Sequence, residues 1–177
     1  MVKSLQIVGL SLFLLFSTLF FIPKTNFYYL VEKELKKQNV VLSDESIVEG
    51  GFSLNIKDAD IYFESIKSAN IKELDITTLL FYNSINVKDI KLSGIAKSFV
   101  PIDIKSIEAT YTILNPLEVT IVANGVFGDA KANFDIVDKK LHLTLQPSKL
   151  MQQRYKKTLK YLVKNKNGVY NYDTIFN

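Results

Sequence analysis

Few residues in this chain combine a reactive side chain with a neighbour that could assist it. The only histidine, His142, lies in the alternating stretch 141–145, which predicts a strand that turns His142 and Thr144 towards solvent. A catalytic base must reach the group that it activates, and the sequence offers no nucleophile or partner near this histidine. We therefore predict that His142 is not catalytic.

A second candidate for chemistry is the pair Asp58 and Asp60, which a strand would direct to one face. Two carboxylates could touch a cation, but Ca²⁺ takes six to eight oxygen ligands and no further ligands stand nearby. The chain also has no Cys, which excludes thiolate catalysis, cysteine-based zinc sites and disulfides. Because phosphate-binding loops and nucleophile elbows are also missing from the sequence, we predict no metal, no cofactor and no enzymatic activity.

Residues 5–22 form an uninterrupted apolar run that decides where the rest of the chain can work. Eighteen uncharged residues reach the lower limit for a helix that spans a bilayer. The run ends in the bulky residues 19–23, which do not suit signal peptidase, so we expect it to be retained. The sequence predicts a transmembrane signal anchor over residues 1–24 and places the domain that follows it outside the cytoplasm. The alternative is a buried core helix.

Residues 25–39 have apolar residues at helical spacing and predict a short amphipathic helix, with Thr25 or Asn26 as its N-cap. Two interpretations stay open for this juxtamembrane helix. Tyr28 and Tyr29 could lie in the headgroup layer of the membrane, or the helix could cover one end of the structure that follows.

From Val40 to Gln146 the hydrophobic period changes to two, which predicts eight to ten short strands in an antiparallel β-meander. The alternating stretches are 54–56, 59–63, 71–76, 85–87, 90–92, 102–104, 107–113, 117–123, 130–136 and 141–145. The parity switch near Lys57 and Asp58 predicts a bulge or turn, and Asp138-Lys139 predicts a hairpin. One face of such a sheet is apolar, so it must close on itself, meet a second layer or hold something apolar. Periodicity does not choose among a sandwich, a half-pipe and an incomplete barrel.

Residues 148–166 carry seven of the 22 basic residues and no acidic one. Ser148 predicts a helix start, and an apolar stripe from Leu150 to Leu162 lies opposite the charges. Asn167-Gly168 predicts the end of this helix, and residues 169–176 predict a final strand. This basic helix could bind anionic lipid or an acidic partner, or its stripe could simply cover the sheet while the lysines stay solvated. The candidate surface consists of Lys149, Arg154, Lys156, Lys157, Lys160 and Lys164. Nucleic-acid binding is not expected, because the chain has a single arginine.

A resemblance to a known family rests on the stretch YTILNPLEVTIVANGVFGDAKANFDI (Tyr111 to Ile136), on LHLTLQPSKL and on the closing NGVYNY. These segments, together with the N-terminal anchor and the serial strands, resemble protein N of the type II secretion system and, more widely, AsmA-like membrane-anchored β proteins. The sharpest part is GVFGDAKA. Its Gly125 and Gly128 are also expected from a turn with positive φ alone.

The resemblance implies an inner-membrane accessory protein whose periplasmic β domain, here residues 40–177, supports a cell-envelope machine, with no catalytic residues to transfer. From the sequence we therefore expect a scaffold with envelope proteins and the lipid bilayer as partners. The alternative is a lipid-binding or lipid-transfer module of the AsmA-like or lipopolysaccharide-bridge type, in which the apolar sheet face holds acyl chains.

Overall fold

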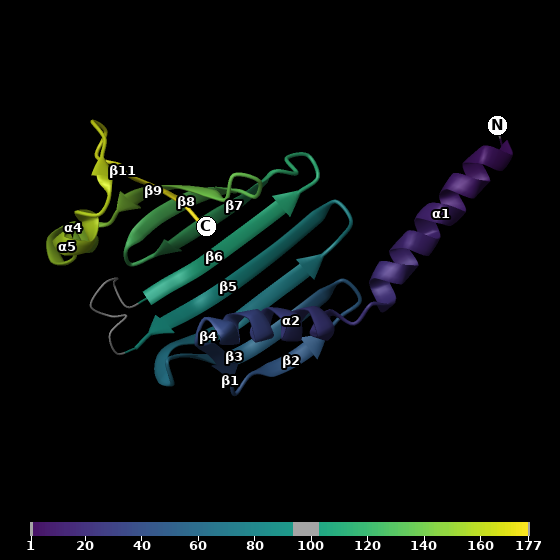
Figure 1. The fold of residues 1–177 in the computed structure, drawn as a ribbon, viewed down its shortest axis with the longest axis horizontal. Helices are drawn as coiled ribbons and strands as arrows, with labels where there is room; N and C mark the ends of the chain where they lie inside the picture. The colour runs from purple at the N-terminus through teal and green to yellow at the C-terminus, as the bar shows by residue number, and fades with distance from the viewer. Residues whose placement is uncertain (1, 94–102, 177) are drawn as a thin grey trace.

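The computed structural model describes residues 2–93 and 103–176, and the protein is mainly β. Two helices, α1 (Val2–Phe21) and α2 (Lys24–Lys37), precede a single large sheet (Figure 1). Its strands are β1 (Val40–Ser43), β2 (Ser46–Glu49), β3 (Ser53–Phe63), β4 (Ile66–Thr78), β5 (Tyr82–Leu92), β6 (Asp103–Thr112), β7 (Glu118–Gly125), β8 (Gly128–Asp135), β9 (Lys140–Pro147), β10 (Val163–Lys164) and β11 (Tyr170–Ile175). The antiparallel β-meander expected from the alternation is confirmed.

The sheet is open. Its strand order is β1-β3-β4-β5-β6-β7-β8-β9-β11-β10, and β2 also pairs with β3. Consecutive strands are neighbours from β3 to β9. Chain order is broken at the two sides of the sheet, where β1 pairs with β3 and β11 pairs between β9 and β10. Among the architectures that periodicity left open, the described residues therefore form one curved, unclosed layer (Figure 1).

Several stretches that the sequence predicts as separate short strands belong to single long ones. In β3 the residues that face the apolar side change from even to odd positions at Asp58 (φ 57°). In β5 they change from odd to even positions at Asp89 (φ 52°). Pairing continues in register past Asp58, with Lys57 opposite Glu73 on one side and Ala59 opposite Ile71 on the other. The bulge or turn expected near Lys57 is thus a kink inside a strand. Ile102, assigned to another stretch, lies outside the described residues.

Helix α2 covers the apolar face of β1 to β4. Tyr28 is 3% exposed and belongs to the same core cluster as Leu54 and Ile56, which are almost fully buried. Tyr29 is 54% exposed. Of the two interpretations of this helix, covering the sheet is the one that the contacts of Tyr28 support. The Tyr28 hydroxyl donates to Glu45 (3.0 Å). Burial, as the larger cause, and this hydrogen bond, as the smaller one, raise the pKa of the tyrosine.

The N-terminus of α2 is capped from another element. The helix begins at Lys24, after Pro23 at the N-cap, so the expected cap by Thr25 or Asn26 is wrong. Instead, Glu49 of β2 accepts hydrogen bonds from the Lys24 amide (2.6 Å) and the Thr25 hydroxyl (2.9 Å). These two bonds lower the pKa of Glu49, as expected for a carboxylate at the positive end of a helix.

The joint between α1 and α2 is closed by one lysine. The buried Lys24 ammonium donates to the carbonyls of Leu19 (2.6 Å) and Phe20 (3.0 Å) in the last turn of α1, and to the carbonyl of Ile22 (2.6 Å) just after it. The Phe20 ring packs edge-on against Phe52 in the β2–β3 turn, 5.3 Å between centroids. These contacts tie the end of α1 to the sheet.

Within the described residues, no helix taken alone has both the length and the apolar composition needed to cross a membrane. The segments Gln6–Phe21 and Lys24–Lys37 satisfy the test only together, as a pair bent by 61°.

The predicted helix over 148–166 is shorter and broken. It consists of α4 (Lys149–Arg154) and α5 (Lys156–Leu159), separated at Tyr155, whose φ of −113° is not helical. The Ser148 hydroxyl accepts from the Met151 amide (3.1 Å), so the predicted cap is present. Met151 and Leu159 pack against Leu145 in a second core cluster, whereas residues 163–164 already pair with β11.

The turn between β7 and β8 needs a glycine at one position. Gly125 pairs with Gly128 across Val126-Phe127, and Gly128 has a φ of +119°. A Cβ at Gly128 would lie 2.1 Å from the Gln146 carbonyl oxygen in β9. The hairpin and the next strand therefore meet closely at this residue.

We predict that Gly128→Ala destabilises the fold by more than about 3 kcal/mol, because it adds a backbone clash to an unfavourable φ. Gly168→Ala is the matched control, since Gly168 has φ +82° but no atom within 4 Å of an added Cβ. It should cost about 1 kcal/mol. Thermal unfolding of the detergent-solubilised chain, followed by circular dichroism, measures both. Equal losses would show that the close approach to Gln146 has no effect.

Candidate functional site

The inward-facing side chains of successive strands lie opposite one another in rows that cross the whole sheet. The first row is Leu54, Ile76, Ile85, Ala109, Ile121, Ala132, Leu143 and Tyr172. The second row is Ile56, Leu74, Val87, Ile107, Ala123, Ala130, Leu145 and Tyr170. We call these two rows the apolar face.

The apolar face is covered at its two sides and open between them. Helix α2 buries the residues of β3, and α4 with α5 buries Leu145 of β9. In the middle of the first row Ile85 is 42% exposed, although its cross-strand neighbours Ile76 and Ala109 are apolar. An apolar strip is therefore left in contact with water.

A hollow of about 410 Å³ lies over this open strip. It is lined by Ile76, Thr77, Thr78, Asn83, Ser84, Ile85, Ala109, Tyr111 and Val119. Its volume falls in the range of small-molecule sites. Asn83 and Tyr111 pair across β5 and β6, so the polar groups of the hollow stand at the end next to the β4–β5 turn. This arrangement can bind an elongated apolar molecule with one polar end.

The opposite face of the sheet is polar. The Lys88 ammonium bonds Glu73 (3.0 Å) and Asp75 (3.4 Å), and these carboxylates raise the pKa of the lysine. Asn55 donates to the same two acids. Such exposed pairs contribute little stability each, but they make one face hydrophilic and leave apolar binding to the other.

His142 has a partner that local sequence reasoning missed. Its Nδ1 lies 2.8 Å from an Asp173 carboxylate oxygen, because β11 returns to pair with β9. The two residues are 31 positions apart, and the only signal for the contact was the prediction of a final strand over 169–176. Both side chains are about half exposed on the polar face, away from the hollow.

The predicted carboxylate pair is separated by the kink in β3. Asp60 is buried and bonded by the ammonium of Lys67 and by the Asn70 amide (2.7 Å), whereas Asp58 is exposed at the kink. These two donors, Lys67 first, lower the pKa of Asp60. Across residues 2–93 and 103–176, no three potential metal ligands come together.

The basic residues of α4 and α5 lie at the end of the sheet opposite to α1 (Figure 1). Lys156, Lys160 and Lys164 line one shallow hollow of about 410 Å³ with Gln152, Leu159 and Tyr170. The Lys164 ammonium stands 5.6 Å from the centre of the Tyr170 ring. Lys149, Arg154 and Lys157 are exposed but do not line this hollow.

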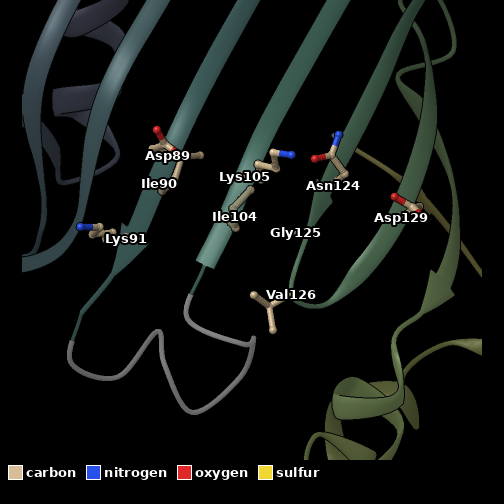
Figure 2. Close-up of a pocket in the computed structure, with 9 residues that line it drawn as sticks. All are labelled: Asp89, Ile90, Lys91, Ile104, Lys105, Asn124, Gly125, Val126 and Asp129. Atoms are coloured by element: carbon tan, nitrogen blue, oxygen red, sulfur yellow. The ribbon is translucent and has the colours of Figure 1, made fainter.

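A larger hollow of about 770 Å³ lies at the ends of β5 to β8. Figure 2 shows that its charged side chains, which include Asp89, Lys91 and Lys105, point in different directions and do not converge. We assign this hollow no role.

Comparisons with protein families, curated proteins and solved structures give no match to this chain.

The Asp60–Lys67 pair predicts a pH dependence of stability. The folded pKa of Asp60 lies below the ordinary value of about 3.9, so the pair stabilises the fold above that pH and loses its effect as the pH falls through the folded pKa. We expect Asp60→Asn to reduce the loss of stability between about pH 5 and about pH 2. Urea unfolding across this range measures the change.

The control variant is Asp58→Asn, which leaves the Asp60–Lys67 pair in place and suits the left-handed backbone at the kink. It should retain the acid-induced loss. The same pH profile for wild type and Asp60→Asn would contradict the prediction.

Proposed function

We propose that this protein is a membrane-anchored lipid-binding module whose apolar face holds an acyl chain. The observation that carries the proposal is the open strip between α2 and the α4–α5 pair, where Ile85 stays exposed and its apolar neighbours are only partly buried beneath a hollow of about 410 Å³. Complete burial of an exposed Ile side chain is worth about 1.5–3 kcal/mol, so covering the 42% of Ile85 that is still exposed is worth roughly 1 kcal/mol, which favours an apolar ligand there.

The distribution of polar groups favours an amphiphile over a purely apolar ligand. Thr78, Asn83 and Tyr111 gather at one end of the hollow, while Ile85 and Ala109 form its floor. An acyl chain on the floor would put its polar end beside the β4–β5 turn. The hollow offers no nucleophile with an adjacent base, so the proposed activity is binding or transfer of the lipid and not its conversion.

The proposal includes an anchor in the inner membrane with the sheet in the periplasm. The apolar side chains of α1 project into open space, with Leu10, Phe13 and Leu14 each more than 60% exposed. Figure 1 shows α1 extending away from the sheet, so a bilayer is the cover that its composition favours.

Blocking the hollow tests the lipid proposal. We expect Ala109→Trp to lower the binding of a photoactivatable fatty acid at least about tenfold, since a loss of about 1.4 kcal/mol suffices. The adjacent Thr110→Trp, which faces the polar side, should bind as wild type does. The readouts are photo-crosslinking to the full chain in nanodiscs and mass spectrometry of co-purified lipid. Equal labelling of both variants would sink the proposal.

A second candidate is the scaffold function in a cell-envelope machine such as type II secretion. The observation that favours it is the position of Lys156, Lys160 and Lys164 at the end of the sheet farthest from α1. With α1 in a membrane, these lysines would face away from it and towards an acidic protein surface.

Charge reversal tests the scaffold candidate. We expect the triple change of Lys156, Lys157 and Lys160 to Glu to abolish in-cell crosslinking to specific envelope proteins while lipid binding stays unchanged. The control reverses Lys57 and Lys72, two exposed lysines at the kink of the sheet. If the crosslinked proteins are the same in wild type and in the triple variant, the basic surface is no docking site.

A further inference from the structure

We propose that the end of the sheet next to α1, where the strands turn, inserts into the surface of the membrane that holds α1. This end is formed by the turns of alternate hairpins. We call it the rim, and it consists of Phe52, residues 79–81, residues 113–117 and residues 136–137. This inference rests on the proposed anchor, and it adds a second, independent contact between the sheet and the bilayer.

The rim is strongly apolar and highly exposed. Leu114 is 92% exposed and Val137 67%, while Phe81, Ile113 and Leu117 are each at least half exposed. Side chains of this kind at turn tips are unusual, because turns are normally built from polar residues. The turns 79–81 and 113–117 contain no charged residue at all.

Hydrogen bonds between neighbouring turns make the rim continuous. The Thr78 amide donates to the Phe52 carbonyl (2.8 Å), Ile113 to Phe81 (3.2 Å) and Ile136 to Leu117 (2.9 Å). Each turn is thus held by its neighbour. At about 4.8 Å per strand, the rim extends roughly 30 Å from β3 to β9.

The rim begins where α1 ends. Phe20 of α1 packs against Phe52, and its ring fills the space beside Gly51 so closely that an added Cβ would lie 2.0 Å away. A bilayer that holds α1 would have its surface near Lys24, which places Phe52 at the level of the headgroups. The following turns continue from that point along the same end of the sheet (Figure 1).

The opposite end of the sheet has a different composition. The β3–β4 turn is Glu64-Ser65, and the exposed Phe63 and Ile66 flank this charged tip. Phe127 of the β7–β8 turn is buried under α4 and α5. Among the described turns, the uncharged apolar tips 79–81 and 113–117 therefore distinguish the end that carries α1. In the β8–β9 turn the apolar residues 136–137 are followed by one acidic and one basic residue, Asp138 and Lys139, so the rim as defined has no excess of positive charge. The contact should therefore depend on insertion of side chains and not on anionic lipid.

The chain has no cysteine, so single cysteines can report depth in the full-length protein. We would label Leu114→Cys with an environment-sensitive fluorophore and reconstitute the chain in phosphatidylcholine vesicles that contain a quencher lipid. Ser65→Cys, at the opposite turn, is the matched control, and Leu14→Cys reports the anchor. Val137→Cys, at another tip, guards against a local effect of the label.

We expect blue-shifted, lipid-quenched emission at positions 114, 137 and 14, and water-like emission at position 65. About 1 M salt should leave these signals unchanged, since charge screening does not weaken insertion. Water-like emission at 114 and 137 with a lipid signal at 14 would overturn the rim while the anchor stands. Water-like emission at 14 with lipid signals at 114 and 137 would overturn the anchor, and with it the statement that α1 and the rim share one membrane, while insertion of the rim itself would stand. A lipid signal at 65 equal to that at 114 would also overturn the rim, because the sheet would then lie flat.

Discussion

The structure depends on the need to cover an apolar face that is wider than the helices available to cover it. Cross-strand rows run from Leu54 in β3 to Tyr172 in β11, and α2 together with α4 and α5 reaches only the two sides. A closed barrel or a second sheet would remove this mismatch. The described strands form neither a closed barrel nor a second sheet, so the central strip stays open. The proposed binding of lipid follows from this open strip.

The parts of the fold that short-range rules govern could be predicted from sequence. The alternation of apolar residues predicts the antiparallel meander, and the Ser148 cap and the final strand follow from their own neighbours. Strand continuity was harder to predict. A parity switch at Asp58 has the same pattern as a strand end, and only pairing with β4 reveals that the strand continues through a kink.

The candidate site was predictable only in outline. Sequence indicates that one face is apolar, but it does not indicate which residues lack a cover, because that depends on where α2 and α5 pack. The capping of α2 by Glu49 and the pairing of His142 with Asp173 join residues 24 to 31 positions apart, and local windows contain no trace of either. The break at Tyr155 was missed because a helical stripe continues across it.

The Lys24 joint has a mechanical consequence. Only Ile22 and Pro23 separate the two helices, so the connection reaches no farther than about 11 Å even when extended. The Lys24 ammonium binds two carbonyls of α1 and the carbonyl of Ile22, and Glu49 binds the start of α2, so the connection has little freedom to move. With α1 in the proposed anchor, a module tethered this tightly would meet its own bilayer at high effective concentration and would not reach across a wide gap. A lipid bound for a distant membrane would then have to pass to another carrier.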